Sequence, residues 1–89
     1  MEETRIATIP KNQREQIAVR LADMHGRVMA DVRVFATNRD GDVVPTAKGV
    51  AIRPDLLPAV IVALQQAQAL AVERGLIEGG ADDGPDRAG

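Results

Sequence analysis

The chain has 89 residues, no cysteine, a single histidine and a formal net charge of −2 at pH 7. This length is that of one small domain, in which a single core is only just sufficient and association with another chain helps. The missing cysteine excludes disulfides and thiolate metal sites. No apolar run reaches the ~20 residues of a membrane span, and the acidic start of the chain lacks the basic region of a secretory signal, so we expect a cytoplasmic protein.

Charge is unevenly distributed along the chain. Residues 78–89 carry four carboxylates and one arginine, whereas residues 11–53 carry eight lysines and arginines against five carboxylates. A locally basic body is typical of nucleic-acid binding, although solvated surface charge explains it equally well. The end of the chain is rich in Gly and Asp, and we expect residues 78–89 to form a disordered acidic tail behind a domain at residues 1–77.

Alternating side chains predict strands in the first part of the chain. Residues 5–9 form a short alternation that predicts an edge strand ending at Pro10, because proline cannot donate to a ladder. Residues 16–22 predict a second, half-buried strand. A four-residue link at residues 23–26, which contains a glycine, joins it to a longer alternating strand at residues 27–35 as a β-hairpin.

The strand at residues 27–35 has two unlike faces, because strand side chains repeat every two residues. One face is apolar and comprises Val28, Ala30, Val32 and Val34. The other face carries Arg27, Met29, Asp31, Arg33 and Phe35, the only aromatic residue of the chain. This pattern predicts a sheet that is covered on one face and presents the other to a ligand.

The following segments are shorter. Residues 36–42 form a polar loop, Val43 and Val44 a short strand ended by Pro45, residues 46–49 a turn, and residues 50–53 a further strand. Together with the earlier strands and their short links, these segments indicate an antiparallel meander.

A helix is predicted from Pro54 to about Arg74. Proline is favoured near the first helical position, because the N–H group that it lacks would have no partner within the helix. The carboxylate of Asp55 is favoured there because the helix N-terminus is partially positive. Pro58 either bends the helix or marks its true start, and Gly75 is a C-terminal stop. Apolar side chains recur at helical spacing, and others lie off this stripe, so the apolar surface is wider than one sheet face requires and favours a dimer. The stripe comprises Leu57, Val60, Ile61, Leu64, Ala67 and Ala71, with Leu56, Val62 and Leu70 off it.

This order of elements and several short strings resemble one known family. The family is the single-stranded-DNA-binding domain of the transcriptional coactivator called positive cofactor four, especially its small bacterial members. The resemblance spans roughly residues 6–69, and the Pro-Thr-x-Lys-Gly string and the Asp-x-Arg strand are its most specific parts. The strings lie at residues 9–12, 25–27, 28–33, 45–50 and 53–58.

The resemblance implies an α+β fold, in which a curved four-stranded antiparallel β-sheet is followed by one long C-terminal α-helix. It also implies a homodimer whose sheets form channels for unpaired DNA strands running in opposite directions. Such a protein works without a cofactor or catalytic residue. From composition and charge we also expect no metal, no small-molecule substrate and no association with a membrane. We therefore expect a nucleoid-associated bacterial protein that binds single-stranded DNA or RNA and acts as a transcriptional coactivator or regulator with the transcription machinery.

Carried over by position, the resemblance implies binding through His25, Arg27, Arg33 and Lys48. Alternation and charge add Arg14 and Arg20 from the preceding strand. The family usually has an aromatic residue at the hairpin position held here by Met24, and its aromatic pair at the end of the next strand is reduced to Phe35 followed by Ala36. The nucleic-acid-binding candidates are thus Arg14, Arg20, Met24, His25, Arg27, Arg33, Phe35 and Lys48.

Alternative interpretations stay open at several of these residues. Arg27 and Arg33 either contact phosphates or pair with Asp31, and Phe35 is either a stacking platform or a core residue. An enzyme is not expected, because Asp40 and Asp42 have no catalytic partners arranged around them. The alternative to a nucleic-acid binder is a dimeric scaffold of the same fold, which has lost its aromatic platforms and binds a protein partner.

Overall fold

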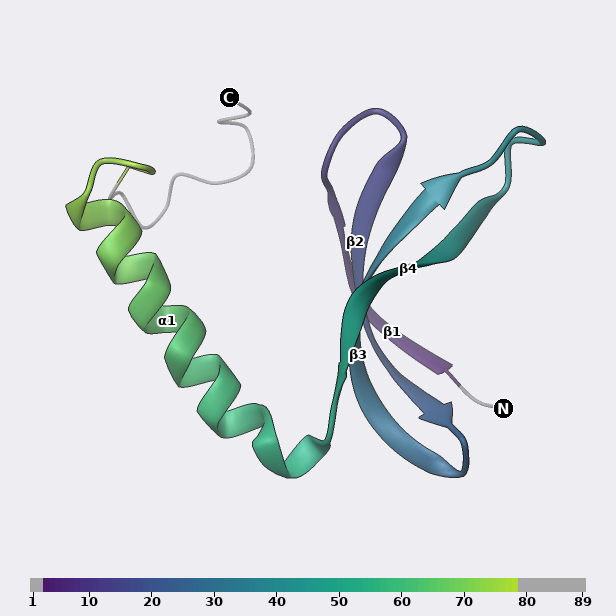
Figure 1. The fold of residues 1–89 in the computed structure, drawn as a ribbon, viewed down its shortest axis with the longest axis horizontal. Helices are drawn as coiled ribbons and strands as arrows, with labels where there is room; N and C mark the ends of the chain where they lie inside the picture. Colours follow the sequence, from purple (N-terminus) through teal and green to yellow (C-terminus); the bar gives the residue numbers. More distant parts are fainter. Residues whose placement is uncertain (1–2, 79–89) are drawn as a thin grey trace. The chain divides into compact units, whose positions relative to one another are not determined.

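The computed structural model of this protein describes residues 3–78. The predicted disordered tail therefore lies outside the described residues, apart from Glu78. The chain divides into two units, one up to Leu57 and one from Pro58 onward. The first unit is a twisted antiparallel sheet and the second is a helix (Figure 1).

Four strands form the sheet in the order in which they follow along the chain. They are β1 (Glu3–Pro10), β2 (Glu15–Met24), β3 (Arg27–Thr37) and β4 (Val43–Ile52), and each pairs antiparallel with the next. The predicted fold class, an antiparallel meander followed by one helix, is confirmed.

The prediction for β4 was wrong in detail, because its two short strands are one continuous strand. Between the pairs Arg33↔Gly49 and Phe35↔Pro45, β4 contains two more residues than β3, which is a bulge and not a turn. The Thr46 hydroxyl stabilises this bulge by donating to the Val34 carbonyl at 2.8 Å and accepting from the Lys48 amide at 3.1 Å. Pro45 is tolerated inside the strand because β4 is an edge strand.

The hairpin between β2 and β3 is tighter than predicted. Met24 pairs directly with Arg27, so the loop is only His25 and Gly26. Both loop residues have positive φ, 58° and 85°, as a type I′ turn requires. The Asp23 carboxylate accepts the Gly26 amide at 3.0 Å and closes the turn.

The strand register gives the sheet two faces, because directly opposed residues of an antiparallel pair point to the same side. One, the polar face, comprises Glu3, Arg5 and Thr8 of β1, Gln16, Ala18, Arg20, Ala22 and Met24 of β2, and Arg27, Met29, Asp31, Arg33 and Phe35 of β3. The other, the apolar face, comprises Ile17, Val19 and Leu21 of β2 and Val28, Ala30, Val32 and Val34 of β3.

Burial in the single chain is greatest on the polar face, which reverses the sequence expectation of a dry apolar face and an open cationic one. Of the buried residues Ala18, Ala22, Ala30, Asp31 and Phe35, only Ala30 belongs to the apolar face. Val28 on the apolar face is 54% exposed. Among the described residues of the sheet unit, Val28 and Val50, which opposes Val32 from β4, are each 54% exposed, so this part of the apolar face is uncovered.

A single 3₁₀ turn, Pro54–Leu56, follows β4 and leads into the helix α1 (Leu57–Glu73). Pro58 is the second residue of α1 and so marks its start. Gly75 ends the helix as predicted: with φ 75°, it donates to Val72 O at 3.0 Å, and Leu76 donates to Ala71 O at 2.8 Å. This pair of hydrogen bonds is a Schellman motif.

Apolar side chains of α1 remain uncovered in the single chain. No residue of the helix is buried, and Leu64 and Ile61 are 64% and 51% exposed. By length and composition alone, Pro54–Glu73 is long and apolar enough to cross a membrane, which corrects the expectation that no run reaches that length. A helix that packs against a protein surface meets the same criteria.

Candidate nucleic-acid interface

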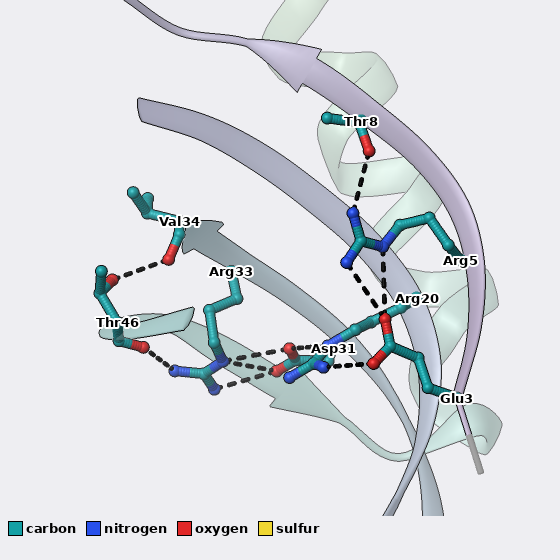
Figure 2. A network of polar contacts seen from close by, with 8 residues as sticks. All are labelled: Glu3, Arg5, Thr8, Arg20, Asp31, Arg33, Val34 and Thr46. Atoms are coloured by element: carbon teal, nitrogen blue, oxygen red, sulfur yellow. Dashed lines mark hydrogen bonds and ion pairs between the residues drawn. The ribbon is translucent and has the colours of Figure 1, made fainter. Parts of the chain in front are cut away.

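Asp31 is the centre of the polar face. Its side chain is fully buried and opposes Arg20 in the register of β2 and β3. Arg20 Nε donates to Asp31 Oδ2 at 2.9 Å, and Arg33 donates to both carboxylate oxygens, with Nη2 2.9 Å from Oδ1 (Figure 2). Arg33 Nη1 also donates to the Thr46 carbonyl at 2.9 Å and so ties β3 to the bulge of β4.

The charge of Asp31 is secured by its two partners. Burial alone would raise the pKa of this carboxyl, but the hydrogen bonds and charges of Arg33 and Arg20 outweigh burial and lower the pKa below its ordinary value. The same contacts raise the pKa of Arg20 despite its own partial burial. Both shifts favour the charged forms of Asp31 and Arg20 at neutral pH.

A second carboxylate joins this network from the edge strand. Glu3 accepts from Arg20 Nη1 at 2.9 Å through one oxygen, and from Arg5 Nε and Nη2 at 3.3 and 3.2 Å through the other (Figure 2). Burial alone would raise the pKa of Glu3, but the hydrogen bonds and charges of Arg20 and Arg5 lower this pKa below its ordinary value. Arg5 also donates to the Thr8 hydroxyl at 3.1 Å.

The only aromatic ring lies beneath two of these arginines. The guanidinium carbons of Arg5 and Arg20 are 4.9 and 5.2 Å from the centroid of the Phe35 ring, within cation–π distance. Phe35 is only 6% exposed. Its ring therefore supports the arginines and offers little surface on which a base could stack.

The hairpin end of the polar face is more open. Arg27 is exposed, and its side chain makes no ion pair within residues 3–78. Met24 lies opposite Arg27 on the same face, and His25 is exposed at the turn. Beside them is a pocket of about 530 Å³, lined by Glu3, Arg20, Ala22, Asp23, Met24 and His25.

Two predicted site residues lie away from the polar face. Arg14 is in the β1–β2 turn, where its carbonyl accepts the Thr37 amide at 3.0 Å. Lys48 Nζ is 3.8 Å from Glu15 Oε2, and the Lys48 side chain is 70% exposed. Glu15 precedes Gln16 in β2 and is therefore on the opposite face of the sheet. The structure thus brings Arg20, Met24, Arg27, Arg33 and Phe35 together on one face, with His25 at its end, and places Arg14 and Lys48 elsewhere.

Gly49, next to Lys48, is explained by packing within the sheet. A Cβ atom at this position would lie 2.6 Å from the Val32 carbonyl oxygen and 2.8 Å from Arg33 Cα. The close approach of the two strands therefore accounts for a glycine at this position.

Sequence reasoning missed Glu3 and Arg5, which complete the charged cluster. The alternation at residues 5–9 predicted a strand but gave no register, and the bulge between Arg5 and Ala7 makes the register unpredictable from alternation alone. Four arginines and two carboxylates share the polar face, so positive charge remains after internal pairing. Residues 3–78 contain no group of three or more metal-ligating side chains placed to hold a metal ion.

The fold matches solved structures of one kind. A PC4 homologue from Burkholderia pseudomallei in a tetragonal crystal form shares 39% sequence identity over 75% of this chain and 98% of its own, with a TM-score of 0.69. Its orthorhombic form gives 40% identity over 73% of this chain and 88% of its own, with a TM-score of 0.66.

A more distant structure shares the fold. This protein is a bacteriophage T5 homologue of the eukaryotic transcription coactivator PC4, implicated in recombination-dependent DNA replication; it is 15% identical over 83% of each chain, with a TM-score of 0.58. No protein-family model and no curated protein sequence matches the chain.

These findings define the class first: a PC4-like sheet-and-helix fold with a cationic sheet face. At 39% identity over nearly the whole Burkholderia protein, the chain belongs to the family of PC4, the positive cofactor four named above.

Proposed function

We propose that this protein binds single-stranded nucleic acid, with DNA as the first ligand, along the polar face of its sheet. One observation carries the proposal: the strand register gathers Arg20, Arg27 and Arg33 on one face, in a chain that belongs to the PC4 family. Arginine's planar set of donors suits phosphate oxygens, and cationic grooves that follow a backbone are typical of single-strand binders.

Hydrogen bonds within the protein use only some of the N–H groups of Arg20 and Arg33. A guanidinium has five N–H groups. Arg20 donates from Nε to Asp31 and from Nη1 to Glu3. Arg33 donates from Nε and Nη2 to Asp31 and from Nη1 to the Thr46 carbonyl. The remaining N–H groups stay available to phosphates, and the buried carboxylate fixes the direction in which they point. Arg27, which has no such restraint, supplies the most accessible charge.

We further propose that the working form is a homodimer. The uncovered apolar side chains of α1 and of the apolar face are too many for a stable monomer in water, and a second copy provides a matching apolar surface. The Burkholderia relative is described as a PC4 homologue, and the phage relative as a homologue of the transcription coactivator PC4 implicated in recombination-dependent DNA replication. These descriptions support a role in transcription or in DNA replication.

The test is fluorescence anisotropy of a labelled single strand of about 20 nucleotides, measured at several salt concentrations, with duplex DNA and single-stranded RNA of the same sequence as competitors. Contacts to about three to six phosphates give a log–log salt slope of about −2 to −4. Size-exclusion chromatography with light scattering measures the oligomeric state of the same samples. Failure of a folded dimer to bind the single strand at low salt would overturn the proposal.

Arg27→Ala locates the site. Its matched control is Arg39→Ala, because Arg39 is also an exposed arginine and lies in the β3–β4 loop. Loss of one phosphate contact makes the slope shallower by about 0.7 and lowers affinity by about threefold to tenfold at low salt. Equal losses in both variants would mean that charge in general, and not the polar face, attracts the strand.

A second candidate function, a dimeric scaffold that binds a protein partner, is favoured by one observation. Phe35 is 6% exposed and Met24 stands where the family usually has an aromatic residue, so the polar face offers no open ring. This candidate gives a dimer in light scattering and no single-strand binding at any salt concentration.

A further inference from the structure

Two arginines of the polar face converge on one exposed carboxylate. Glu3 holds Arg20 through one oxygen and Arg5 through the other, at 2.9 Å and 3.2–3.3 Å, while both guanidinium groups lie over the Phe35 ring. The ring therefore keeps two cations side by side, at a spacing that one oxyanion bridges. Figure 2 shows Glu3 between the two arginines, on the inner side of the curve of β1.

The two carboxylates of this cluster differ in how easily they can be replaced. Asp31 is fully buried and accepts hydrogen bonds at both oxygens from two strands. Glu3 is on the edge strand, its side chain is 35% exposed, and it borders the pocket of about 530 Å³ at the hairpin end. An exposed ion pair contributes little to stability, so an incoming anion can displace Glu3 at low cost.

A nucleic-acid phosphate has what is needed to take this place. A phosphodiester, like a carboxylate, presents two oxygens that accept paired N–H groups from arginine. The pocket beside Glu3 is open to solvent and large enough to receive a phosphate with its sugar, and Met24 and Ala22 provide an apolar wall.

We propose that Glu3 is an internal competitor: its carboxylate occupies a phosphate position between Arg5 and Arg20 and sets the affinity of the polar face for single strands. This inference rests on the proposed function and extends it to a residue that limits binding. When a strand binds, its phosphate replaces the Glu3 carboxylate, and Glu3 turns towards solvent.

Glu3→Gln tests the proposal, because it keeps the size of the side chain and removes its charge. The matched control is Glu73→Gln at the exposed end of α1, which makes the same change of charge at a residue that is not part of the polar face. Binding of a labelled oligothymidine is measured at several salt concentrations. We expect Glu3→Gln to tighten binding by about fivefold, near the upper limit for an exposed ion pair, and to steepen the salt slope by up to about 0.7, with Glu73→Gln close to the native protein.

Phe35 provides an independent readout, because it is the only phenylalanine and ring-labelled phenylalanine reports this site alone. Addition of the oligothymidine should shift the Phe35 ring resonances as Arg5 and Arg20 change partner, at lower concentration in Glu3→Gln than in the native protein. If the native protein binds the strand but Glu3→Gln binds equally or more weakly, Glu3 is not a competitor and the proposed function stands. If none of the three proteins binds, both proposals fail.

Discussion

Replacing Asp31 by asparagine preserves the shape of the side chain and removes its charge. In the native protein both oxygens of Asp31 are occupied by the guanidinium groups of Arg20 and Arg33 at 2.9–3.1 Å. Asparagine offers one acceptor oxygen and places an amide donor against guanidinium donors. Two arginines then lose the charge that balances them.

The cost follows from how well water can reach the two arginines. Removing one partner of a buried ion pair costs about 3–5 kcal/mol. The side chains of Arg20 and Arg33 are 14% and 18% exposed, so water compensates them in part, which moves the expected loss to about 2–3 kcal/mol. For a domain of this size that loss lowers Tm by about 10–20 °C.

Urea unfolding followed by circular dichroism measures the loss, at one fixed protein concentration because dimer stability depends on concentration. Asp40→Asn in the exposed β3–β4 loop is the control and should change stability by less than about 0.5 kcal/mol. If Asp31→Asn were as stable as this control, the network around Asp31 would not hold the polar face together. A folded Asp31→Asn protein should also bind single strands with a steeper salt slope, because it carries more uncompensated positive charge.

Other consequences can be tested on the same samples. Gly49→Ala should lower stability by about 1–3 kcal/mol, because its Cβ meets the backbone of β3 at 2.6–2.8 Å; an unchanged thermal transition would contradict this packing. Glu3 and Asp31 have lowered pKa values in the folded state, so their contribution is present above about pH 5 and is lost as acid titration passes through the folded values; Asp31→Asn should flatten this part of the stability curve, and an unaltered acid transition would disprove the assignment. Met24→Phe should strengthen single-strand binding by about 1–3 kcal/mol with an unchanged salt slope, with Met24→Leu as the control that adds no ring.

The sequence predicted the fold well because its strongest patterns are local. Alternation over residues 16–22 and 27–35 depends only on the pleat, and it correctly separated Arg20, Asp31 and Phe35 from the valines of the opposite face. The start of the 3₁₀ turn at Pro54, which leads into α1, and the end of α1 at Gly75 depend on backbone rules that act within one turn.

What could not be predicted depends on residues far apart in the sequence. Pro45 was interpreted as a strand end, because the bulge of β4 is defined only by its pairing with the neighbouring strand β3, where Gly49 lies close to Arg33. The sequence could not decide whether Phe35 is a stacking platform for bases or a core residue, because the side chains that lie over its ring, Arg5 and Arg20, come from two other strands. The pairing of Arg33 with Asp31 was weighed as an alternative to phosphate contact, and the structure shows the pair without testing the phosphate contact.

The buried ring has a consequence for how binding should depend on salt. Stacking of bases on open rings contributes about 1–3 kcal/mol per base and changes little with salt, whereas phosphate contacts weaken as counterions accumulate. With Phe35 covered and Met24 at the hairpin, the affinity proposed here rests almost entirely on arginines, several of which are already paired within the protein. Binding should therefore be strong only at low ionic strength. An added ring at Met24 should raise affinity equally at every salt concentration, whereas the loss of Glu3 should raise it mainly at low salt.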